Sequence, residues 1–120
     1  MYDWKLVDLA TNDVNNINTG AATYTFSWST VPTRIFAGCL LTNKSFVFTN
    51  ATSVGTNAFN STKIVSINIP NVSIIYSEAF HNCKQLTTVT TSNLITTIQS
   101  SAFLDCSALT TIDLSNVTTI

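Results

Sequence analysis

The chain has 120 residues, and 45% of them are hydrophobic, which is enough to build the core of one domain. Only 9% of the residues are charged and the formal net charge is -1, so the sequence has no basic footprint for nucleic acid and no polybasic patch for anionic lipid. No stretch approaches the roughly 18 consecutive apolar residues of a membrane span, so we expect no membrane insertion.

The first 23 residues differ from the rest of the chain. DWKLVDL (3–9) is typical of a strand and ATNDVNNINTGA (10–21) of a turn-rich connection, without the basic start and apolar run of a secretory signal. We interpret residues 1–23 as an N-terminal β cap, because the end of a stacked repeat exposes apolar core and an unpaired strand edge. In the alternative interpretation Tyr2 and Trp4 dock on a partner, and one segment could do both.

Residues 24–120 contain a repeat of 21 to 23 residues, in which an aliphatic residue is followed five positions later by a phenylalanine. The aliphatic positions are Val31, Val54, Ile75 and Ile98, and the aromatic positions are Phe36, Phe59, Phe80 and Phe103. A fifth unit begins at Val117 and Ile120. No unit of this size can bury its own apolar residues, so consecutive units must stack. The repeat therefore predicts two buried ladders, one of phenylalanine and one of aliphatic residues.

Each unit has the pattern of a strand, a second extended segment and a short helical turn. The alternation of a strand occurs at Phe46 and Phe48 and again at Ile67 and Ile69. Tyr24 and Phe26 lie 22 residues before Phe46 and Phe48, so they fit a first rung. A hydroxyl residue lies three positions before each phenylalanine, where it would cap a helical turn. These residues are Thr33, Thr56, Ser77 and Ser100.

The segment IVSINIPNVSIIYSEAFHNCKQL (64–86) resembles a unit of the BspA-type leucine-rich repeats of bacterial and protist surface proteins. The family pattern is L-x-x-I-x-I-P, then V-x-x-I, then A-F-x-x-C-x-x-L. Its matching residues are Ile67, Ile69, Pro70, Val72, Ile75, Ala79, Phe80, Cys83 and Leu86. The resemblance extends from about residue 24 to residue 120, although Thr62 replaces the cysteine of the second unit and Ile35 the alanine of the first. It implies a curved solenoid for adhesion or protein binding, with no catalytic residues.

The fold class that we predict is a β-rich repeat solenoid, a leucine-rich-repeat-like stack of parallel strands with short helical turns. It would have four to five units of 21 to 23 residues after the N-terminal β cap.

The residues able to do chemistry do not form a catalytic pattern. His81 is the only histidine and occupies a position that other units fill with Ala, Asn or Leu, which favours a solvated turn residue. Cys39, Cys83 and Cys106 lack paired spacing and occupy a core column, so we expect free buried thiols. The six acidic residues have no calcium-loop or paired-carboxylate spacing. We therefore expect no enzyme, no metal and no cofactor.

A candidate binding strip follows from the strand register. If the strands are aligned, their outward side chains form a mainly polar, nearly uncharged surface. Its predicted members are Val47, Asn68, Thr90 and Asp113, beside Ser66, Thr88 and Thr111. Such a surface lacks electrostatic steering, so it should bind through shape, hydrogen bonds and multiple copies in an assembly.

Our main functional hypothesis is a non-enzymatic protein-binding or adhesion module, as a structural component of a virus (phage) particle. The low charge, the abundance of Thr, Ser and Asn, and the leader without an export signal favour a virion. One alternative is a cellular surface or secreted adhesin fragment, and another is a purely structural protein that cements subunits. The partners would be other protein subunits, a host surface receptor or a glycan, and not nucleic acid.

Overall fold

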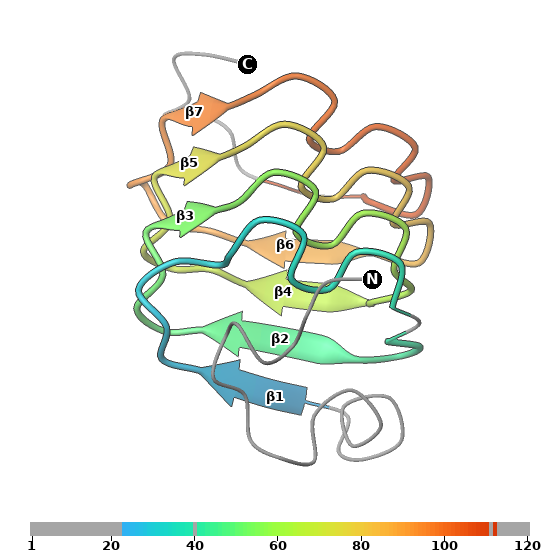
Figure 1. The fold of residues 1–120 in the computed structure, drawn as a ribbon, viewed down its shortest axis with the longest axis horizontal. Helices are drawn as coiled ribbons and strands as arrows, with labels where there is room; N and C mark the ends of the chain where they lie inside the picture. Colours follow the sequence, from blue (N-terminus) through green and yellow to red (C-terminus); the bar gives the residue numbers. More distant parts are fainter. Residues whose placement is uncertain (1–22, 40, 111, 113–120) are drawn as a thin grey trace.

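The computed structural model describes residues 23–39, 41–110 and 112, which wind into a stack of coils (Figure 1). Sheet A contains the parallel strands β1 (Thr23–Phe26), β2 (Ser45–Phe48), β4 (Ser66–Asn68) and β6 (Thr88–Thr90), in that order. Sheet B contains the parallel strands β3 (Ser53–Val54), β5 (Ile74–Ile75) and β7 (Thr97–Ile98). Each coil passes once through each sheet, so the strands of the two sheets run in opposite directions. The predicted solenoid of parallel strands is confirmed.

Sheet A forms because its strands alternate between apolar and polar residues, which places every second side chain in the core. In β2, Phe46 and Phe48 are buried while Ser45 and Val47 are half-buried on the outer side. Tyr24 pairs with Phe46 in the register of β1 with β2, and their rings stack at 6.0 Å. The predicted first rung at Tyr24 and Phe26 is therefore confirmed.

Both predicted ladders run through the core. The ring centroids of successive phenylalanines lie 5.0 Å (Phe36 to Phe59), 5.4 Å (Phe59 to Phe80) and 5.2 Å (Phe80 to Phe103) apart. The first three rings are fully buried, whereas Phe103 at the end of the described stack is only partly covered. The aliphatic ladder is buried along its whole length, at Val31, Val54, Ile75 and Ile98. Because each ring packs on those of adjacent coils, the ladder ties the coils together.

The helical turns that we predicted are wrong, since the described residues contain no helix. Each phenylalanine instead lies in an arch (33–38, 56–61, 77–82 and 100–105), in which the residues two before and two after it have positive φ. These left-handed positions are Arg34 and Gly38, Asn57 and Ser61, Glu78 and Asn82, and Ser101 and Asp105. A right-handed helix cannot pass through two such residues per turn.

The capping role of the hydroxyl column is wrong for the same reason. In the first arch, the Ile35 N–H donates to the Pro32 carbonyl at 3.3 Å, and the Phe36 N–H donates to Ala58 of the next coil at 2.8 Å. Backbone carbonyls therefore satisfy the N–H groups that a Thr33 side chain would have capped. The second and third arches repeat this pattern, and the Ser77 hydroxyl donates to the side chain of Gln99 at 3.2 Å.

Part of the abundance of Ser and Thr has a structural role between the sheets, where hydroxyl groups link successive coils. Thr52 Oγ1 donates to the Ser29 carbonyl at 3.4 Å, Ser73 Oγ to Thr52 at 3.3 Å, and Thr96 Oγ1 to Ser73 at 3.3 Å. Each bond adds to the backbone bonds of the same coils.

Residues 1–22, most of the predicted cap, lie outside the described residues, as do Val117 and Ile120 of the predicted fifth unit. The division at residue 23 stays a prediction.

Candidate functional site

The outward face of sheet A is the candidate binding surface, and we call its outward side chains the strip. The register aligns them in two columns across four strands. One column is Thr23, Ser45, Ser66 and Thr88, and the other is Thr25, Val47, Asn68 and Thr90. Neighbouring strands lie about 4.8 Å apart, and alternate residues of one strand about 6.6 Å apart, so the strip spans roughly 14 by 7 Å between Cα atoms.

The structure brings together five of the seven residues predicted for this surface. Val47, Asn68 and Thr90 lie in one column, and Ser66 and Thr88 in the other. Asp113 and Thr111 lie outside the described residues, as do Tyr2 and Trp4 of the predicted docking segment. Whether any of these residues binds a partner stays a prediction.

Sequence reasoning missed three members of the strip, Thr23, Thr25 and Ser45. The signal that could have identified them was the spacing of 22 residues between Tyr24 and Phe46, because an inward residue fixes its two neighbours as outward. With these residues included, every side chain of the strip is uncharged, and all except Val47 carry a hydroxyl or amide group.

The strip is most exposed at its two ends. Thr23, Thr25, Thr88 and Thr90 are exposed, whereas the side chains of the two central strands are half-buried. At the centre the Ser66 hydroxyl donates to the Ser45 hydroxyl at 2.7 Å, which orients both groups across neighbouring strands. The surface therefore has a hydrogen bond between strands at its centre and exposed side chains at both ends.

Asn68 holds the one polar atom of the strip that is buried without a hydrogen bond among the described residues, its Oδ1. Its neighbour on one side in the column is the apolar Val47, which offers no donor. A buried acceptor without a partner costs about 1–3 kcal/mol, so a donor supplied by water or by a ligand would stabilise this position. The centre of the strip therefore has an unsatisfied acceptor.

His81, for which the sequence favoured a solvated turn residue, lies half-buried in the third arch. Its two ring nitrogens lie 3.7 Å from carboxylate oxygens of Glu78 in the same arch and of Asp105 in the next. Among the described residues, no group of three or more His, Cys, Asp and Glu side chains could hold a metal ion. The contacts are thus weak ion pairs between adjacent arches when His81 is protonated.

The cysteines form a packing column, as predicted. Cys39 and Cys83 are buried, Cys106 is partly buried, and all three are free thiols. The thiol of Cys83 donates to the Phe59 carbonyl at 3.0 Å and that of Cys106 to the Phe80 carbonyl at 2.9 Å. Burial raises the pKa of Cys39, and a hydrogen bond with Cys83 together with burial raises the pKa of Cys106. The hydrogen bond with Cys106 lowers the pKa of Cys83, but this thiol is fully buried. Raised pKa values at Cys39 and Cys106 and complete burial at Cys83 make all three poor nucleophiles, which argues for packing.

Thr62 replaces a cysteine in this column without disrupting it. Its hydroxyl lies 3.5 Å from the sulfur of Cys83, and the side chain is buried. The column therefore selects a small side chain that can share a hydrogen bond, and not thiol chemistry.

Across the described ranges, no helix has the length and apolarity that crossing a membrane would require.

Comparisons with known proteins agree with this architecture. The model of the BspA type leucine rich repeat region matches residues 11–120 in six copies, so the match begins inside the segment predicted as a cap. A crystal structure of a leucine rich cell surface protein from Faecalibacterium prausnitzii A2-165 superposes with a TM-score of 0.57 at 20% identity, over 75% of this chain. The chain spans 31% of that protein. A search among curated proteins gave no match. Because the family model matches most of its length, the chain belongs to the BspA-type leucine-rich repeat family.

Proposed function

We propose that the chain is a non-enzymatic binding module of a cell-surface or secreted adhesin, and that the strip is its contact surface for a partner protein. The observation that carries this proposal is the register of sheet A, which aligns uncharged polar side chains of four successive strands on one face. Proteins built from stacked repeats use such extended surfaces for binding. Members of leucine-rich repeat families are typically binding modules and not catalysts.

The cellular alternative now has more support than the virion hypothesis. The similar solved structure is described as a leucine rich cell surface protein, and the family occurs in surface proteins. Nothing in the comparisons favours a phage particle. We therefore replace the virion as the main hypothesis with the surface of a cell.

The strip suits a contact of weak individual affinity that many copies strengthen. The strip carries no charge with which to steer a partner, so its side chains offer hydrogen bonds and shape only. Several copies on one surface raise the effective concentration of each further contact without new interactions. The binding should therefore depend little on ionic strength.

The test is adhesion of bacteria that display the chain to host cells and extracellular matrix, with two matched double variants. Thr88→Lys with Thr90→Lys adds two charges at the exposed end of the strip. Asn93→Lys with Ser107→Lys adds the same charge at exposed positions outside it. We expect the strip variant to lose at least about tenfold in adhesion, which corresponds to about 1.4 kcal/mol, and the control to retain it. Equal adhesion by the two variants would refute the strip as the contact surface.

A further inference from the structure

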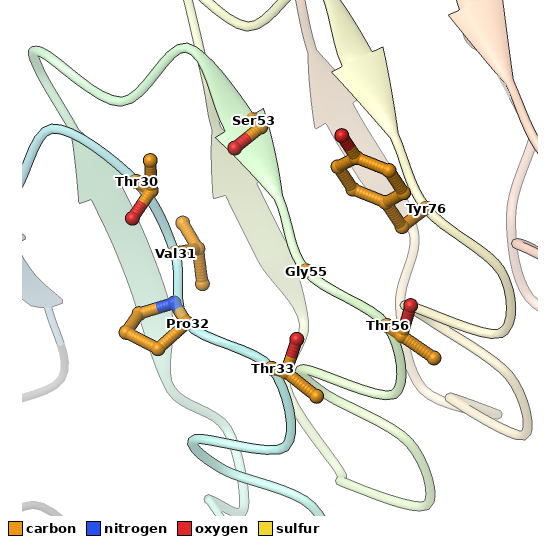
Figure 2. Close-up of a pocket in the computed structure, with 8 residues that line it drawn as sticks. All are labelled: Thr30, Val31, Pro32, Thr33, Ser53, Gly55, Thr56 and Tyr76. Carbon is orange, nitrogen blue, oxygen red and sulfur yellow. The ribbon is translucent and has the colours of Figure 1, made fainter. Parts of the chain in front are cut away.

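Sheet B has a shallow notch on its outer side, between the first and third coils (Figure 2). Its volume is about 260 Å³, and Gly55 lies in its middle. Thr30, Pro32, Thr33, Ser53, Thr56 and Tyr76 are among the residues that line it. This volume is just below the range of about 300–1,000 Å³ that is typical of small-molecule pockets. The notch therefore has room for one small ring.

The notch lies over a column of residues whose middle member is a glycine. Pro32, Gly55 and Tyr76 each follow a residue of the buried aliphatic ladder, so they lie side by side on successive coils. The Gly55 N–H donates to the Val31 carbonyl at 2.8 Å, and the Tyr76 N–H donates to the Val54 carbonyl at 2.9 Å.

Packing enforces the glycine. A Cβ atom at Gly55 would lie 2.6 Å from the Thr33 nitrogen and 2.9 Å from the Val31 carbonyl oxygen, so only glycine fits this approach of two coils. In Figure 2, Tyr76 lies on one side of Gly55, and Val31 and Pro32 lie on the other. The backbone of the first coil therefore takes the place of a side chain at Gly55, and the notch is lined by Pro32 on one side and by Tyr76 on the other.

The chemistry of the lining is neutral, with hydroxyl groups around an aromatic ring. Thr30, Thr33, Ser53 and Thr56 contribute aliphatic hydroxyls, and none of the lining residues is charged. Within the part of the chain that the structure describes, no hydrogen bond occupies the hydroxyls of Thr33, Thr56 or Tyr76. They differ from the hydroxyls of Thr52 and Ser73, which already bond to backbone carbonyls.

We propose that this notch binds one ring of a neutral carbohydrate. A sugar ring presents a face of C–H groups that can pack on Tyr76 and a rim of hydroxyls that can exchange hydrogen bonds with Thr33 and Thr56. A charged peptide segment would find no opposite charge in the notch. One ring in a shallow site binds weakly, with a Kd of about 1 mM, and repeated sugars on a surface would raise the avidity. The site lies on sheet B and is independent of the strip.

The experiment is an NMR titration of the purified chain with the neutral methyl glycosides of glucose, galactose, mannose and N-acetylglucosamine. At least one glycoside should shift the backbone amides of Gly55 and Thr56. Tyr76→Ala should lower the affinity for that glycoside by about tenfold. Tyr76→Phe keeps the ring and should lower the affinity by less than about threefold. Thr90→Ala, in the strip, should leave the affinity unchanged.

Three results would overturn the proposal. The first is the absence of any amide shift at Gly55 with every glycoside up to tens of millimolar. The second is unchanged affinity in Tyr76→Ala. The third is a protein that binds only acidic sugars and loses this binding in Arg34→Gln. Arg34 lines a neighbouring depression and not the notch, so this result would place the sugar site elsewhere. Because the strip variants and the Tyr76 variants lie on different sheets, failure of one proposal leaves the other testable.

Discussion

Replacing Phe59 by alanine should remove a large part of the folding free energy. Phe59 is fully buried, and its ring centroid lies 5.0 Å from that of Phe36, 5.5 Å from Phe46, 6.1 Å from Phe48 and 5.4 Å from Phe80. Truncating a buried phenylalanine to alanine costs about 3–5 kcal/mol through lost burial and the cavity left behind. Because four rings lose a neighbour at once, we expect a value at the upper end of this range.

The matched control is Phe103→Ala at the end of the same ladder. Phe103 is only partly buried and contacts one described ring, that of Phe80 at 5.2 Å. We therefore expect a loss of about 1.5–2.5 kcal/mol, near half of the value at Phe59. Phe59→Leu, which conserves most of the volume, should cost less than about 1.5 kcal/mol.

Urea unfolding followed by circular dichroism measures the three free energies, provided that one slope m describes wild type and variants. Since stacked repeats can unfold in parts, a second probe is needed, and the fluorescence of Trp28, which packs on Phe36, should report the same midpoint when Trp4 is replaced by phenylalanine in every protein. Equal losses at Phe59 and Phe103, or a loss below about 1 kcal/mol at Phe59, would refute a continuous ladder as the main support of the stack.

Three further predictions concern glycine, histidine and the thiols. Gly55→Ala should lower the free energy of unfolding by about 1–3 kcal/mol, because its Cβ would collide with backbone. Gly38→Ala meets no atom within 4 Å but has a φ of 76°, so it should cost about 1 kcal/mol through backbone strain alone, and a smaller loss at Gly55 than at Gly38 would contradict the collision. His81→Ala should change stability by less than about 1 kcal/mol in thermal unfolding, since its two ion pairs are 3.7 Å long and near the surface, and a larger loss would identify a structural role. The raised pKa of Cys39 means that the unfolded chain releases this proton first, so the contribution of Cys39 to stability should be full below about pH 8.5 and fall above it. Urea midpoints of wild type and Cys39→Ala from pH 7 to 10 test this, and an equal fall in the two proteins would contradict it.

The sequence predicted the ladders because a core column admits few residue types. Phe36, Phe59 and Phe80 recur at the period of the coil, and the same period aligned Val47 with Asn68 and Thr90 on the opposite side of the strands. The resemblance to the BspA-type repeat gave the same register independently.

The arches could not be predicted in the same way. Phe80 and Cys83 are three residues apart, a spacing that suits one helical turn and also a succession of tight turns. Left-handed backbone is usually signalled by glycine, but Glu78 and Ser101 adopt it here, so the sequence carried no mark of it.

The notch was also hidden, for a reason of tertiary structure. Gly55 lines the notch together with Pro32 and Tyr76, which are 23 and 21 residues away in the chain. The close approach of Gly55 to the backbone of Thr33 depends on how two coils pack, which a column of residue types does not specify.

Photo-crosslinking from the strip tests the central claim most directly. A benzoylphenylalanine placed at Thr88 or at Thr25, both exposed, should form covalent adducts with a protein of the cells or matrix to which the displayed chain adheres. The same probe at Asn93 or Ser107, exposed outside the strip, should form none. Adducts from the control positions together with none from the strip would contradict the assignment of sheet A as the contact surface.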